Sequence, residues 1–183
     1  MSKQILVFTL LLACASAFGA SKRFDLPKGT VEFDIPSGWQ SSKGLLGMPL
    51  VILSPEIKGQ KRAVLGVVPI TKVDYEITPN DVGTDSSNYK KGREKFLRSQ
   101  NGKSLEYFPL EPATLGESKG FTAGYKYKIG SVVAEEHTYY VVCNKTFFHL
   151  KTLYSEENKS RFEPEMKKTL ESFRCPASNG GSK

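Results

Sequence analysis

The sequence has few of the residues and motifs from which catalytic and redox centres are commonly built. Its 183 residues include only three cysteines and two histidines, and no two cysteines form a C-x-x-C pair. A dithiol redox centre is therefore not indicated. A G-x-S-x-G stretch is absent, and so are the glycine patterns of Walker and dinucleotide-binding loops. These absences remove the usual sequence evidence for a serine hydrolase or a nucleotide-binding protein.

Long apolar runs are also scarce, and the clear example lies at the N-terminus. The stretch from Ile5 to Ala13 follows a lysine and is too short to span a bilayer as a helix. A small-residue motif, ASA, comes next and fits a signal-peptidase site with cleavage before Phe18. We therefore expect residues 1–17 to be a secretory signal peptide.

A second processing route is open at the same end of the chain. The residues LLAC, ending at Cys14, resemble the lipobox of bacterial lipoproteins, in which the cysteine becomes the lipidated first residue. The first route gives a periplasmic or secreted protein, and the second gives a membrane-anchored lipoprotein. Only lipidation at Cys14 would hold the protein on a membrane.

The composition indicates one globular domain with a basic character. Hydrophobic residues make up 39% and charged residues 25%, and the formal net charge is +7. Without the signal, roughly 165 residues remain, enough for one domain with its own core. We expect this domain over residues 24–175, after a linker at 18–23 and before a flexible tail at 176–183.

Alternation of apolar and polar residues predicts a series of β-strands. TVEFDI, for example, places its valine, phenylalanine and isoleucine on one face. Two-residue turns at Gly130-Ser131 and Asn144-Lys145 would join three of the strands into a meander, with Lys126 opposite Glu135. The expected strands cover residues 30–35, 50–53, 63–68, 105–110, 121–129, 132–143 and 146–154.

Helical spacing of apolar residues predicts two helices. One covers residues 87–101, after a loop at 78–87 that is rich in proline, asparagine, aspartate, glycine and serine. The other covers 164–173, with Pro164 in its first turn. Since apolar side chains occupy both faces of the meander, we expect a helix on each face.

The remaining cysteines, Cys143 and Cys175, form an even pair in an exported protein, which favours a disulfide. Cys143 pairs with Thr146 in the expected hairpin, on the face that carries Val141 and Phe148. The last helix runs back along the sheet and would bring Cys175 to this point. A bridge would then fasten the helix to the sheet; the alternative is two separate buried thiols.

Several short segments resemble the PsbP/DcrB-like group of exported small proteins and lipoproteins. They are FDIPSGW at 33–39, GFTAGYKY at 120–127, the meander, and ESFR at 171–174. The resemblance implies an α+β fold, an α/β/α sandwich with a central antiparallel sheet flanked by helices. It supplies no catalytic motif, and the better-known members of the group are accessory or assembly proteins.

Basic residues are concentrated around the first predicted helix. Such a patch could bind an anionic surface, such as lipid headgroups, a polyanion or an acidic protein, or it could be a solvated helix face. Nucleic acid is not expected as a partner, because export removes the protein from it. The residues of the predicted patch are Lys90, Lys91, Arg93, Lys95, Arg98 and Lys103.

The two histidines do not suggest a metal or catalytic centre. His149 is expected opposite Tyr140 in the meander, while His137 points to the other face, so the two should not converge. We expect no metal, no cofactor and no catalytic residue. The leading hypothesis is an exported, non-catalytic binding or assembly module of the cell envelope.

Two alternatives remain open. An envelope hydrolase would need a cleft in which His137 or His149 lies within hydrogen-bonding reach of a carboxylate or serine. A carrier of a small apolar ligand would need a pocket between sheet and helix, lined by Tyr125, Tyr127 and Tyr140.

Overall fold

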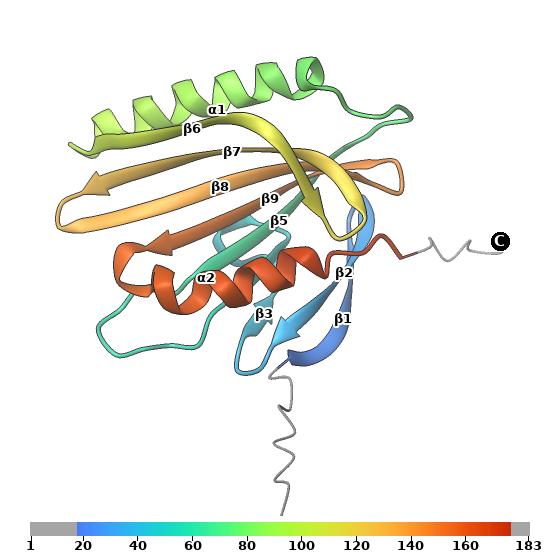
Figure 1. Ribbon diagram of the computed structural model, residues 1–183, viewed down its shortest axis with the longest axis horizontal. Coiled ribbons are helices and arrows are strands. Elements are labelled where there is room, and N and C mark those ends of the chain that lie inside the picture. The colour runs from blue at the N-terminus through green and yellow to red at the C-terminus, as the bar shows by residue number, and fades with distance from the viewer. Residues whose placement is uncertain (1–17, 177–183) are drawn as a thin grey trace, which may run out of the picture.

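The computed structural model describes residues 18–176, so the predicted signal peptide, Cys14 and residues 177–183 lie outside the described residues. Seven strands of the described chain form one antiparallel sheet in the order β3-β4-β5-β9-β8-β7-β6 (Figure 1). Its strands are β3 (Gln40–Ser42), β4 (Leu50–Leu53), β5 (Val64–Lys72), β6 (Lys103–Leu115), β7 (Ser118–Ile129), β8 (Val132–Cys143) and β9 (Thr146–Ser155).

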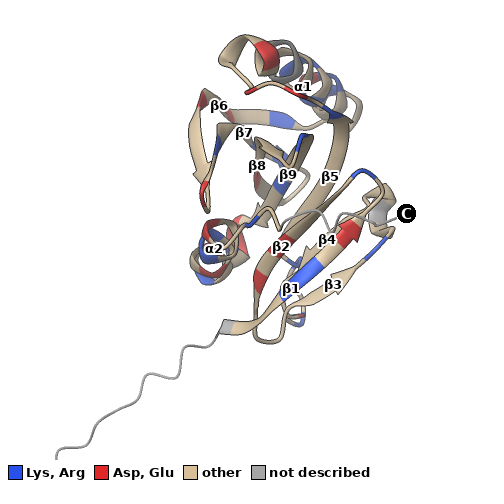
Figure 2. Ribbon diagram, turned by 90° about the vertical axis from the view of Figure 1, so that its right-hand side faces the viewer, with Lys and Arg blue, Asp and Glu red and all other residues tan. Residues whose placement is uncertain are grey.

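The two faces of this sheet are covered by different elements. Helix α1 (Pro79–Ser99) packs on one face, against β6 and β7, as Figures 1 and 2 show. Helix α2 (Glu156–Glu171) packs on the other face, next to a separate ribbon of β1 (Phe18–Leu26) and β2 (Gly29–Pro36). A one-turn 3-10 helix, Leu45–Gly47, joins β3 to β4. The predicted α+β sandwich with a central antiparallel sheet is confirmed.

The larger part of the core lies between the sheet and α2. The ring centroids of Phe33 and Phe173 are 5.4 Å apart, which joins β2 to the end of α2. Trp39, the single tryptophan, meets Phe162 of α2 edge to face at 5.8 Å and donates its indole N–H to Glu165. These residues bury their apolar surface together, which is the main stabilising contribution available to the domain.

The meander has the register that the sequence predicts. Lys126 lies opposite Glu135 in the β7–β8 pair, and Cys143 lies opposite Thr146 in the β8–β9 pair. Asn144 and Lys145 both have positive φ angles, 47° and 59°, as the tight turn between β8 and β9 requires. The turn thereby fixes which side chains of β8 and β9 face α2.

A disulfide joins Cys143 of β8 to Cys175, which follows α2. The Cα atoms are 5.3 Å apart, and the bridge closes a segment with a sequence separation of 32. Cys143 is buried in the same cluster as Phe148 and Leu150. The bridge therefore fastens the end of α2 to the sheet, in the position that the strand register indicated.

Helix α1 begins earlier than expected, because residues 78–87, predicted as a loop, are helical from Pro79. The amide N–H and hydroxyl of Thr78 both donate to the Asp81 carboxylate, at 2.7 and 2.6 Å, which stabilises the first turn. Val82 is fully buried against the sheet. Capping and burial therefore outweigh the low helix propensity of this segment.

Two further boundaries were predicted wrongly. Helix α2 begins at Glu156, so Pro164 lies inside it rather than in its first turn. Ser155 is the N-terminal boundary residue, and two glutamates follow it in the first turn, where acidic side chains suit the helix dipole. Residues 18–23, expected as a linker, form most of β1, which pairs with β2 along its length.

Candidate functional site

Helix α1 carries an exposed row of basic side chains. Lys91, Lys95 and Arg98 follow each other at i, i+4 and i+7, so they lie on one side of the helix. All three are exposed, and Figure 2 shows basic residues along α1 at the outer surface of the domain. We call these three residues the basic stripe. Lys90 and Lys103 of the predicted patch are exposed as well.

Arg93 is not part of this exposed surface. Its guanidinium forms an ion pair with Glu136 of β8 and lies 4.8 Å from the ring centroid of Tyr127 and 4.9 Å from that of Phe96. The Tyr89 hydroxyl donates to the same glutamate. Arg93 and Tyr89 therefore hold α1 to the sheet, and the predicted patch is reduced to its exposed members.

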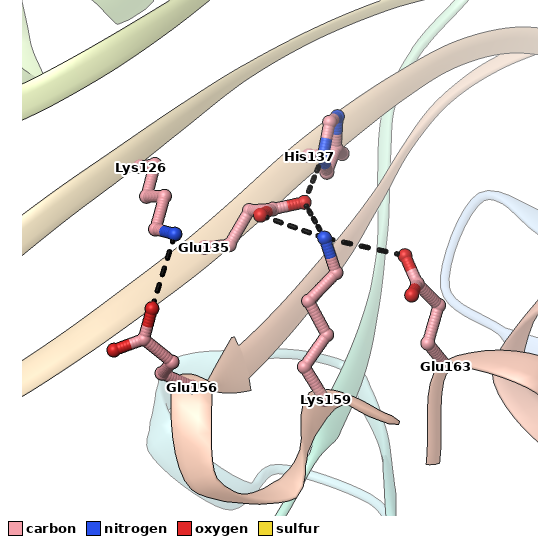
Figure 3. A network of polar contacts seen from close by, with 6 residues as sticks. All are labelled: Lys126, Glu135, His137, Glu156, Lys159 and Glu163. Atoms are coloured by element: carbon pink, nitrogen blue, oxygen red, sulfur yellow. Dashed lines mark hydrogen bonds and ion pairs between the residues drawn. The ribbon is translucent and has the colours of Figure 1, made fainter. Parts of the chain in front are cut away.

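His137 belongs to a network of polar contacts on the opposite face of the sheet (Figure 3). Its Nε2 lies 3.0 Å from Oε1 of Glu135, and both oxygens of Glu135 accept from the Lys159 ammonium at 2.8 Å. Lys159 also lies 3.5 Å from Glu163 within α2. A second pair, Lys126 with Glu156 at 3.2 Å, stands beside it in Figure 3.

The charge state of Glu135 follows from these contacts. Burial raises the pKa of Glu135, but hydrogen bonds from Lys159 and His137 outweigh it and hold the pKa below its ordinary value. A carboxylate with a low pKa is a weak general base. The cavity that Glu135 lines has a volume of about 20 Å³, room for about one water molecule.

The hydrolase alternative therefore meets one of its two conditions. A histidine does contact a carboxylate, as that alternative requires, but the adjoining cavity is too small for a substrate. The arrangement fits an ion network that connects β8 to α2. The neighbouring Glu136 points to the α1 face, as expected for adjacent strand residues.

His149 lies on the α1 face, opposite Tyr140 as predicted. Its ring meets those of Tyr140 and Phe147 edge to face, with centroids 4.9 and 5.0 Å away. The two histidines thus occupy different faces and do not converge. Within residues 18–176, no group of three or more histidine, cysteine, aspartate or glutamate residues could hold a metal ion.

The predicted tyrosine pocket is wrong for two of its three residues. Tyr125 and Tyr140 are each 1% exposed and pack within the core under α1. Tyr127 does line a cavity, a groove beside the end of α1. Sequence reasoning did not find this groove, because its apolar residues show the same alternation as core residues.

Two solved structures resemble this chain over most of its length. The solution structure of cyanobacterial PsbP (CyanoP) from Synechocystis sp. PCC 6803 has a TM-score of 0.59 and 14% identity, covering 89% of this chain and 95% of that chain. The crystal structure of LpqN from Mycobacterium tuberculosis has a TM-score of 0.59 and 13% identity, covering 85% of this chain and 90% of that chain. The chain has a PsbP-like fold.

The sequence itself matches no protein-family model, and no curated protein shows significant similarity to it. The PsbP-like fold explains why the resembling segments are structural. Phe33 and Trp39, from FDIPSGW, are buried in the core, and Phe173, from ESFR, packs on Phe33. Such residues specify the fold and carry no reaction. Residues 18–176 contain no helix long and apolar enough to cross a membrane.

Proposed function

We propose that this protein is an exported, non-catalytic accessory module of the cell envelope that binds an acidic surface of a partner protein through the basic stripe. The observation that carries the proposal is the division of the α1 cations. Arg93 is used inside the domain, while Lys91, Lys95 and Arg98 point outward together. Aligned cations attract an acidic partner and orient it as it approaches.

Three features of the protein support a location in the cell envelope. A disulfide that fastens α2 to the sheet suits an oxidising compartment, and the N-terminal residues fit an export signal. LpqN, which has the same fold, is involved in cell envelope biogenesis in Mycobacterium tuberculosis. These points support export to the envelope. They do not name the partner, for which the basic stripe requires an acidic surface.

The proposal is tested by site-specific photo-cross-linking in the producing organism. A photoreactive residue replaces Asn88, an exposed position one turn before the stripe, and adducts are identified by mass spectrometry. The variant K91E/K95E/R98E is compared with a control of equal charge change. The control, K22E/K58E/K128E, reverses three exposed lysines in β1, in the segment between β4 and β5, and in β7.

We expect wild type and the control to give the same protein adduct, and the stripe variant to lose it. Retention of the adduct in the stripe variant would overturn the proposal. Loss of the adduct in both variants would also overturn it, because net charge alone would then explain binding. Adducts with lipid in place of protein would assign the stripe to a membrane surface and contradict a protein partner.

A further inference from the structure

An apolar groove lies beside the end of helix α1, on the α1 face of the sheet. Its volume is about 370 Å³, within the lower part of the range of about 300–1,000 Å³ for small-molecule sites. Its apolar lining comes mainly from one face of four neighbouring strands, and the residues on that face are Val64, Tyr127, Ile129, Val132, Ala134 and Leu153. We call it the lateral groove.

The sheet register explains why these residues form one continuous wall. Tyr127 lies opposite Ala134, Ile129 opposite Val132, and Val64 opposite Leu153, so their side chains share a face. Helix α1 ends at Ser99 and leaves part of this wall open, with Val132 39% exposed. The Arg93 guanidinium lies over the Tyr127 ring and holds that side of the wall in place.

The polar end of the groove contains a hydroxyl without a partner. Ser155, the last residue of β9 and the residue before α2, is 6% exposed and lines the groove. Its Oγ is buried and has no hydrogen-bond partner within the part of the chain that the structure describes, and it makes no capping bond to α2. A buried hydroxyl without a partner is costly, which is a reason to expect a ligand group there.

Cationic side chains stand at the same end. Lys61 is exposed at the groove, and its backbone carbonyl accepts a hydrogen bond of 2.6 Å from the buried Asn158 side chain. Arg62 also lines the groove, and its side chain donates to the Ser54 carbonyl at 2.6 Å. Among the described residues, none that lines the lateral groove is acidic.

Acidic residues do line the neighbouring cavity of about 250 Å³, which shares Lys61, Val132 and Ser155 with the groove. They are Glu156, whose carboxylate pairs with Lys126, and Glu157. An anion bound at the junction would therefore be drawn toward Lys61 and Ser155 and away from Glu157. This asymmetry defines the side on which a head group would sit.

We propose that the lateral groove binds a single acyl chain with an anionic head group. The chain occupies the apolar wall, and the head group accepts hydrogen bonds from the Ser155 hydroxyl and the Lys61 ammonium. No covalent step is involved. This site is separate from the basic stripe, and it can exist whether or not the stripe binds a partner.

The test is calorimetric titration of the purified protein with laurate, kept below its micelle concentration, and with monolaurin, an uncharged ligand with the same chain. We expect one laurate to bind per protein. Monolaurin should bind at least about tenfold more weakly than laurate, because a charge-assisted hydrogen bond to the head group is lost. Absence of saturable laurate binding would overturn the proposal. Equal affinity for both ligands would overturn the claim that the groove recognises an anionic head group.

Matched variants locate the binding. Ser155→Ala and Lys61→Gln should each weaken laurate about tenfold and leave monolaurin unchanged. Val132→Glu should weaken both ligands, because it places a charge in the apolar wall. Two exposed residues outside the groove, Lys58→Gln and Leu105→Glu, serve as controls and should change neither affinity. Unchanged laurate affinity in all three groove variants would refute the site.

The folding of each variant is checked by unfolding followed through the fluorescence of Trp39, which lies in the core on the other face. Ser155→Ala should not lower stability, because the hydroxyl has no partner to lose.

A third ligand, lysophosphatidylglycerol, distinguishes a membrane lipid from a free fatty acid as the source of the acyl chain and anionic head group. Tighter binding than laurate would support a membrane lipid as the natural ligand, and weaker binding would support a free fatty acid.

Discussion

Arg93 of helix α1 forms an ion pair with Glu136 of strand β8, joining residues 43 positions apart in the sequence. Both side chains are mostly buried, with 21% and 16% of their surface exposed. The pair divides the cations of α1 into one that holds the helix to the sheet and others that face outward. It thereby separates the contribution of α1 to stability from its proposed role in binding.

The first prediction concerns this ion pair. Arg93→Gln leaves the Glu136 carboxylate partly buried without its cation and should lower the free energy of unfolding by about 1–3 kcal/mol. Arg98→Gln, on the exposed side of the same helix, should change it by less than about 0.5 kcal/mol. Urea unfolding followed by Trp39 fluorescence measures both. Equal effects of the two variants would contradict an inward role for Arg93.

The second prediction concerns the disulfide. In the chain-entropy relation, a bridge with a sequence separation of 32 stabilises the folded state by about 3–4 kcal/mol. The double variant Cys143→Ala/Cys175→Ala should lose about this amount in denaturant unfolding. A single Cys175→Ala variant, which leaves Cys143 buried as a thiol, should lose a similar amount. A loss below about 1 kcal/mol in both would show that packing alone holds the end of α2.

The third prediction concerns pH. Because the pKa of Glu135 is lower in the folded protein, its ion pair contributes stability at pH values above the unfolded pKa. This contribution is lost as pH falls from about 4.3 through the folded pKa. Glu135→Gln should therefore be destabilised relative to wild type at pH 7, and the difference should shrink toward pH 3. Glu117→Gln, at an exposed position, is the control. A difference that does not change with pH would contradict the ionic origin.

The fourth prediction concerns a glycine inside α1. A methyl group at Gly92 would meet no heavy atom within 4 Å beyond its chain neighbours and the local helix backbone, so Gly92→Ala should stabilise the protein by about 1 kcal/mol through helix propensity alone. Gly120→Ala is the contrast, because its Cβ would lie 2.1 Å from the carbonyl oxygen of Tyr140. Thermal unfolding should show a higher midpoint for the first variant and a much lower one for the second. A lower midpoint for Gly92→Ala would contradict the helix placement.

The meander could be predicted from the sequence because two-residue turns and alternation fix the strand register locally. Lys126 opposite Glu135 and Cys143 opposite Thr146 follow from the turns alone. The first residues of the helices could not be predicted from local patterns alone, because they also depend on capping and on burial against the sheet. The segment before residue 87 has weak helix formers, and Thr78, Asp81 and the burial of Val82 decide its structure.

The candidate sites were harder to predict than the fold. The sequence shows that Arg93 is charged, but the direction in which its side chain points depends on where Glu136 and Tyr127 lie in the folded sheet. The lateral groove depends on where α1 ends above the sheet, and its lining residues look like ordinary core residues in the sequence. Ser155 could not be singled out from the sequence, because only the structure shows that its buried hydroxyl lacks a partner.

The most direct measurement is the affinity of the cross-linked partner for the wild-type protein and for K91E/K95E/R98E, at about 0.05 M and about 0.5 M salt. If the basic stripe forms the interface, wild-type affinity falls with salt, and the variant binds at least about tenfold more weakly at low salt. Equal affinities that do not depend on salt would show that the partner binds elsewhere, and the proposed function of α1 would be wrong.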